Sequence, residues 1–90
     1  MYEWDEAKRR SNLKKHRLDF ADAHVVYEHP GKVTIDSPRG SESRHLDLAL
    51  IKVAGRVLAL VYTKRAENVR IISFRNASRE ERVIYESLKV

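Results

Sequence analysis

The chain has 90 residues, no cysteine and a formal charge of +5. This length fits one domain over residues 1–90 and excludes a cofactor domain joined to a substrate domain. The lack of cysteine excludes disulfides, thiolate zinc sites and cysteine nucleophiles. The longest strongly apolar run, residues 57–62, is too short to cross a bilayer, and the first residues have no apolar signal core, so we expect a cytoplasmic protein.

The first 29 residues contain neither glycine nor proline and predict two helices. Asp5 is placed to cap a first helix over residues 5–16. Asp19 is placed to cap a second helix, in which apolar residues from Phe20 to Tyr27 recur at helical spacing. Proline and glycine follow directly after His29, and they end this helix.

Four strands are predicted next, over residues 32–36, 44–53, 56–63 and 69–75, with a loop at 37–41. Their short connections, such as the turn at Ala54–Gly55, are typical of an antiparallel meander. Ser78 and Glu81 have the spacing of a capping box that opens a last helix. The sequence therefore predicts an α+β fold of order ααββββα, with two N-terminal helices, a four-stranded antiparallel sheet and a C-terminal helix.

Basic residues are frequent in the C-terminal third of the chain. If their side chains converge, they form a phosphate site, because guanidinium groups are planar, always charged and bidentate. The competing interpretation is a solvated rim paired with neighbouring glutamates. In a regular strand Arg70 and Arg75 lie on opposite faces, so one site can use both only if the strand twists or bulges. The basic residues of this region are Lys64, Arg65, Arg70, Arg75, Arg79 and Arg82.

Other catalytic signatures are weak. The four histidines have no metal-binding spacing, so we expect neither a metal nor another cofactor. The chain has only three glycines and lacks both a glycine-rich phosphate loop and a G-x-S-x-G motif. These patterns disfavour nucleotide hydrolysis and serine-triad chemistry.

Short motifs in a fixed order run along almost the whole chain, from about Tyr2 to Leu88. They are Trp4-Asp5, Lys8, Asn12, Lys15-His16, Phe20, Ala23, Glu42-x-Arg44, Tyr62-Thr63-x-Arg65, Arg70-Ile71-Ile72-Ser73-x-Arg75-x-Ala77 and Glu81-Arg82-x-x-Tyr85. This ordered set resembles the BrnT toxin family, also called DUF497. The chain departs from the family pattern at Arg17, where glycine is usual, and at Ala49, Phe74 and Asn76.

The resemblance implies a type II toxin–antitoxin toxin with a RelE-like fold. Such a toxin is a ribonuclease that cleaves RNA and arrests translation. The resemblance also implies a cognate antitoxin with a ribbon-helix-helix domain, through which the toxin would reach operator DNA indirectly. No membrane is expected among its partners.

Metal-independent RNA cleavage needs a base for the 2′-hydroxyl, cations for the charge on phosphorus, and an acid for the leaving oxygen. The residues expected to stabilise the charge are Arg65, Arg75 and Arg82. The candidates for proton transfer are His16, Glu42 and Tyr85, among which the sequence does not choose. The residues expected to bind RNA are Lys15, Arg44, Lys64, Arg70 and Arg79.

Two other functions remain open from the sequence. One is a non-catalytic basic module that binds nucleic acid, with an affinity that falls steeply with salt. The other is an interaction protein whose basic face awaits an acidic partner. A ribonuclease shortens RNA at substoichiometric protein, a binding module only retards it, and an interaction protein does neither.

Overall fold

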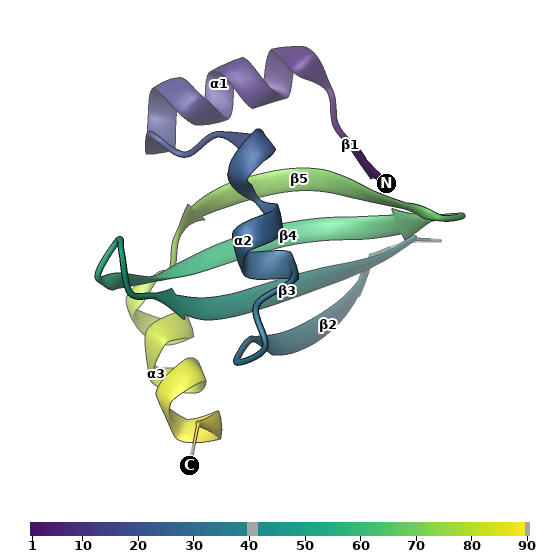
Figure 1. Cartoon of the computed structure of the whole chain (residues 1–90). Helices are drawn as coiled ribbons and strands as arrows, with labels where there is room; N and C mark the ends of the chain where they lie inside the picture. The colour runs from purple at the N-terminus through teal and green to yellow at the C-terminus, as the bar shows by residue number, and fades with distance from the viewer. Residues whose placement is uncertain (40–41, 90) are drawn as a thin grey trace.

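A computed structural model gives the fold of residues 1–39 and 42–89, excluding the side chains of residues 37–39 and 42. Within this described part, a sheet is covered by helices on both of its faces (Figure 1). The elements in chain order are β1 (Tyr2–Glu3), α1 (Glu6–His16), the 3₁₀ helix η1 (Phe20–Asp22), α2 (His24–Tyr27), β2 (Val33–Arg39), β3 (Glu42–Ile51), β4 (Arg56–Arg65), β5 (Asn68–Asn76) and α3 (Arg79–Leu88).

The described residues form a five-stranded mixed sheet in the order β1-β5-β4-β3-β2, so the predicted four-stranded antiparallel sheet is wrong. Strands β2 to β5 form the expected meander, but β1 pairs in parallel with β5. A two-residue strand has no periodicity that a sequence could reveal. It forms because the Val69 N–H bonds the Met1 carbonyl and the side chains of Asn68 and Arg70 bond Glu3.

The N-terminal region differs from the predicted pair of helices as well. The chain begins with a strand, and the second helix is divided into η1 and the four-residue α2. Asp19 does act as a cap, but it accepts the Ala21 N–H at the start of η1, and α2 has no side-chain cap. The predicted loop at 37–41 is wrong at residues 37–39, through which β2 continues, and residues 40–41 lie outside the described part of the chain.

Local signals elsewhere are confirmed. Asp5 accepts the N–H groups of Ala7 and Lys8 at the start of α1. Ser78 and Glu81 accept each other's backbone N–H groups, which is the predicted capping box of α3. None of the helices in the described part is long and apolar enough to cross a membrane.

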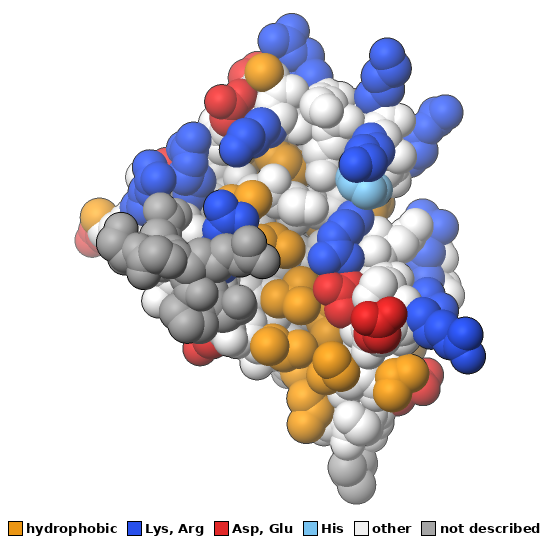
Figure 2. All heavy atoms as spheres, turned by 180° about the vertical axis from the view of Figure 1, so that it is seen from behind, with side chains coloured by type: hydrophobic (Ala, Val, Ile, Leu, Met, Phe, Trp, Pro, Cys, Tyr) orange, Lys and Arg blue, Asp and Glu red, His pale blue; other side chains and the backbone are white. Residues whose placement is uncertain are grey.

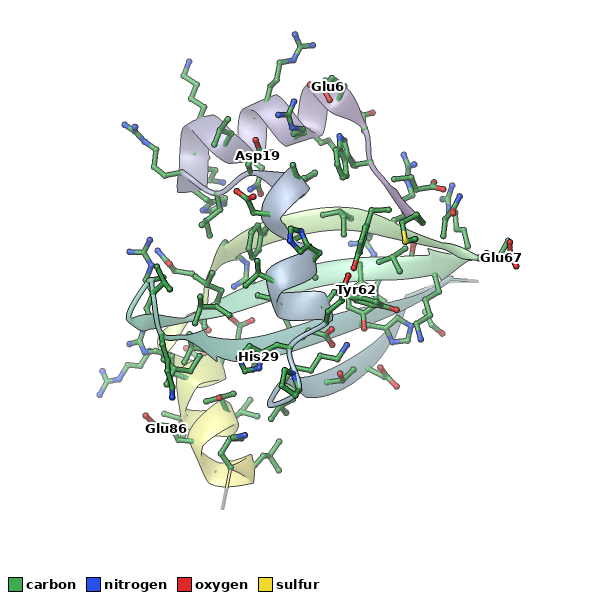
Figure 3. All side chains as sticks on the ribbon, viewed as in Figure 1. Glu6, Asp19, His29, Tyr62, Glu67 and Glu86 are labelled. Carbon is green, nitrogen blue, oxygen red and sulfur yellow. The ribbon has the colours of Figure 1, made fainter. Side chains whose placement is uncertain are left out.

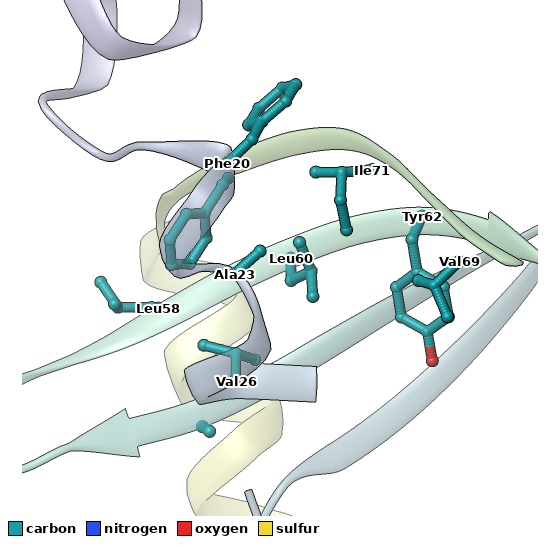
Figure 4. Close-up of a cluster of buried hydrophobic side chains, with 10 residues drawn as sticks. Phe20, Ala23, Val26, Leu58, Leu60, Tyr62, Val69 and Ile71 are labelled. Atoms are coloured by element: carbon teal, nitrogen blue, oxygen red, sulfur yellow. The ribbon is translucent and has the colours of Figure 1, made fainter. Parts of the chain in front are cut away.

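The two faces of the sheet are covered differently. We call the face under η1 and α2 the front face, where Phe20, Ala23 and Val26 pack on apolar side chains of β3, β4 and β5 (Figure 4). We call the other the back face. There α3 covers one end, with Tyr85 packed in a cluster that includes Leu48 and Ala59. We call the rest of this face, which α3 does not cover, its open end (Figure 1).

Helix α1 lies along the outer edge of β5 and is polar nearly all round, with Asn12 as its buried residue. The Asn12 amide donates to the carbonyls of Phe74, at 2.7 Å, and Leu18, at 3.0 Å, and it accepts the Phe74 N–H at 3.2 Å. Arg9 adds a bidentate bond to Asp19, with N–O distances of 2.7 and 2.9 Å. These contacts fix the C-terminal half of α1 beside the middle of β5.

Candidate functional site

A β-bulge in β5 determines which side chains share the back face. Val61 pairs with Ser73 and Tyr62 pairs with Ile71, so Ile72 is the extra residue between them. An extra residue reverses the alternation of the strand. Arg70 therefore lies opposite Thr63 and Arg75 lies opposite Ala59, all on the back face. Because the bulge places both arginines on one face, a single site can use both of them.

Two hollows meet at this bulge. The first has a volume of about 340 Å³ and lies over the open end of the back face. The second, of about 210 Å³, lies between β5 and α1. Ile72 and Ser73 line both, and we call the combined depression the bulge groove. Its other lining residues are Arg44, His45, Leu46, Val61 and Arg75 in the first hollow and Lys8, Ser11, Asn12, Lys15 and His16 in the second.

The charges around the groove are mainly positive. Figure 2 shows the back face, with hydrophobic side chains in its centre and Lys and Arg side chains, beside a histidine, above them. The two hollows together bring cations from α1, β3 and β5 to one surface, although these elements are far apart in the chain. Such a surface attracts polyanions, and phosphate groups above all.

Arg75 is held at the edge of the groove by α3. Its two terminal nitrogens lie 2.7 and 3.0 Å from the two carboxylate oxygens of Glu81. This bidentate bond holds the pKa of Glu81 below its usual range and raises the pKa of Arg75. Because Glu81 also caps α3, the helix start fixes the position of the guanidinium group.

His16 is the last residue of α1 and is partly buried in the second hollow. Burial lowers the pKa of its imidazole, and the positive charges of Lys15 and Arg75 lower the pKa further. Its ring is therefore neutral at physiological pH and can accept a proton. Arg75 belongs to β5 and His16 to α1, yet the charge of Arg75 is among the causes of this lowered pKa.

Three of the predicted RNA-binding residues belong to this region. Arg44 and Lys15 line the groove. Arg70 is on the same face, and its guanidinium lies 2.9 Å from the Glu3 carboxylate.

The other predicted site residues whose side chains the structure describes line neither hollow. Tyr85 is the buried residue of α3, and its hydroxyl accepts the Leu50 N–H. Arg82 donates to the Ala77 carbonyl, and Arg79 is the exposed first residue of α3. Lys64 and Arg65 end β4. Glu42 is the first residue of β3, and its side chain lies outside the described part of the chain.

Several groove residues escaped the sequence reasoning. Ser73 and Ile72 were seen only as motif positions, and their location at a bulge depends on the register between β4 and β5. Lys8 and Asn12 were likewise part of the N-terminal motif. The signal that could have found Ile72 and Ser73 is the requirement for a bulge, since a bulge residue in β5 must lie between Arg70 and Arg75.

The front face carries a second polar cluster, centred on the buried Asp47. Its carboxylate accepts bonds from Lys32 at 2.7 Å, Thr34 at 2.6 Å and the hydroxyl of Tyr62 at 3.1 Å. Burial, followed by the charge of Asp47, raises the pKa of Tyr62, whose ring packs against that of Tyr27 at the end of α2 (Figure 3). Every oxygen of this carboxylate has a partner, so the cluster joins β2, β3 and β4 as a structural network.

Among the described side chains, no three His, Asp or Glu residues gather closely enough to hold a metal ion.

No curated protein sequence is significantly similar to the chain. A family model described as the ribonuclease toxin BrnT of type II toxin–antitoxin systems matches residues 4–81. This range includes α1, the whole of β2 to β5 and the start of α3, and therefore all the residues that line the bulge groove. The chain belongs to the BrnT family of type II toxin–antitoxin ribonuclease toxins.

Proposed function

We propose that this protein is an endoribonuclease that cleaves RNA in the bulge groove without a metal ion and so arrests translation. The observation that carries the proposal is the convergence of a neutral histidine, His16, with Arg75 and Lys15 around the bulge of β5. Membership of a family of ribonuclease toxins supports the same activity.

The groove suits attack by the RNA 2′-hydroxyl on the adjacent phosphate. His16 takes the proton of that hydroxyl, because its lowered pKa leaves the imidazole free to accept it. Arg75 and Lys15 stabilise the negative charge that develops on the phosphorus oxygens. Glu81 orients Arg75, because the bidentate bond holds both terminal nitrogens of the guanidinium group in place. The leaving 5′-oxygen takes its proton from water in the open groove.

Substrate binding relies on charge at both ends of the groove. Arg44 lies on the β3 side, whereas Lys8 and Lys15 lie on the α1 side. A single RNA strand that follows the groove meets cations on either side of the reacting phosphate. Ile72, Leu46 and Val61 provide an apolar floor on which bases can pack.

Membership of a type II toxin family implies an antitoxin partner. We propose that this antitoxin carries a ribbon-helix-helix domain and neutralises the toxin by covering the bulge groove. Cationic side chains beside an apolar floor fit a partner segment that combines acidic and apolar residues (Figure 2). Operator DNA would then be contacted by the antitoxin alone.

Inducible expression in a bacterial host tests the proposal, with growth and RNA integrity followed together, with and without the gene adjacent to this one. We expect arrest with fragmented RNA, and rescue when the adjacent gene is co-expressed. Normal growth and intact RNA from folded protein would contradict the cleavage activity. Arrest that the adjacent product does not relieve would contradict the neutralisation.

A further inference from the structure

Thr63 carries a buried hydroxyl without a partner. The side chain is fully buried, and its Oγ1 is the buried polar side-chain atom in the described part of the chain that makes no hydrogen bond. Burying an unbonded hydroxyl is unfavourable, and valine has nearly the same shape without that cost. Threonine at this position is therefore less favourable for stability than valine would be, and the fold alone does not explain it.

The neighbours of Thr63 are two arginines on the same face. Arg70 lies directly opposite it on β5. The ladder between β3 and β4 ends at the pair of His45 and Tyr62. Arg44 and Thr63 are the next residues along the two strands, so continuing this register by one residue places Arg44 on the other side of Thr63. One hydroxyl donor thus lies between two guanidinium-bearing residues in a row across β3, β4 and β5. Glu3 bonds Arg70 and offsets only one of the two charges.

We propose that this row is a second phosphate subsite of the bulge groove, in which Thr63 donates its hydroxyl to a phosphate oxygen of the RNA strand. The proposal rests on the RNA-cleaving function above. A phosphate accepts several hydrogen bonds at once, and a hydroxyl between two guanidinium groups offers donors of both kinds. Because Thr63 is buried, the proposal requires that the side chains covering its hydroxyl move outward when the ligand binds.

The row binds a phosphate other than the one that reacts. Arg75 lies opposite Ala59, four residues before Thr63 along β4, which is about 13 Å at the rise of a β-strand. Arg44 lines the first hollow and so connects the row to the groove. The subsite therefore holds the RNA strand at a distance from the chemistry and sets its path across the sheet.

The test compares Thr63→Val with Thr63→Ser in binding a short single-stranded RNA whose 2′-hydroxyls are methylated, so that it binds without cleavage. We expect Thr63→Val to raise the Kd about tenfold, the effect of losing one hydrogen bond to a charged group, and to unfold at the same or a higher temperature. Thr63→Ser should bind like the wild type. Arg44→Gln should reduce the slope of log Kd against log salt by about one, whereas Thr63→Val should leave that slope unchanged.

A matched control is Thr34→Val on the front face, where the hydroxyl bonds Asp47. This variant should lose stability and keep its affinity for RNA. Wild-type affinity in Thr63→Val would overturn the subsite, and so would a marked loss of stability, because it would show a structural partner for the hydroxyl. If the wild-type protein cleaves RNA while Thr63→Val binds normally, only the subsite fails. If the wild type neither binds nor cleaves RNA, both the subsite and the proposed function fail.

Discussion

Asn12 shows how one residue can position the site. Its side-chain amide makes both of the backbone bonds to Phe74 that a neighbouring strand would make, and so it replaces a strand at the edge of β5. The sequence marked Asn12 only as part of a motif, since nothing local indicates a partner 62 residues away. Through this contact the C-terminal end of α1, and with it His16, is held beside the bulge.

We predict that Asn12→Ala lowers the free energy of unfolding by about 3 kcal/mol, because it removes three hydrogen bonds and leaves the backbone of Phe74 without partners. Urea denaturation measures this loss. Ser11→Ala, at the neighbouring exposed position, should stay within about 0.5 kcal/mol of the wild type. Equal stability of the two variants would refute this role of Asn12.

His16 predicts the pH dependence of cleavage. A lowered pKa means that the folded protein resists protonation of this imidazole, so the neutral base persists below the ordinary histidine pKa of about 6.5. The cleavage rate should therefore be constant from pH 8 to about 6.5 and should fall only at lower pH. Rates measured on a fluorescent oligoribonucleotide from pH 5 to 8 test this. His16→Gln should be slow at every pH, and an unchanged profile in that variant would exclude His16 as the base.

At the scale of elements, the helix caps were read correctly from local signals, whereas the pairing of the first strand was missed. The caps at Asp5 and Ser78 depend on residues within one helical turn, so the sequence showed them. Strand β1 depends on pairing with β5, which is distant in the chain, and was missed. The second helix was predicted to be continuous, but it is divided into a 3₁₀ turn and a short helix. The spacing of its apolar residues suits both arrangements, so it could not distinguish them.

The end of α1 carries a backbone cost. Arg17 is the C-cap with a φ of 60°, and its N–H bonds the Leu13 carbonyl at 2.9 Å. This left-handed conformation favours glycine, which the family pattern usually has at this position.

We predict that Arg17→Gly raises the free energy of unfolding by about 1 kcal/mol, because glycine removes the clash of a Cβ in this conformation. Urea denaturation provides the measurement. Lys14→Gly, inside the same helix, should instead lower stability by a similar amount, about 1 kcal/mol. A destabilised Arg17→Gly would show that the arginine side chain contributes more than its backbone conformation costs.

At the scale of the whole molecule, the fold separates two tasks. The front face holds a network in which the buried Asp47 is fully bonded, whereas the back face leaves cations beside an open hollow. The sequence left open whether the basic residues converge on one site or form a solvated rim, and it could not select which of them would share a face. That selection depends on the register of β4 and β5, because a bulge of one residue places Arg70 and Arg75 on the same face.

The most direct test of this account is the cleavage of RNA by purified protein, comparing Arg75→Gln with Arg56→Gln. Arg56 is the exposed first residue of β4 and lines neither hollow, so its variant changes the net charge equally and leaves the groove intact. We predict that substoichiometric wild-type protein and Arg56→Gln both shorten the RNA, while Arg75→Gln is slower by about 100-fold. Cleavage by folded Arg75→Gln at the wild-type rate would contradict the assignment of the bulge groove as the active site.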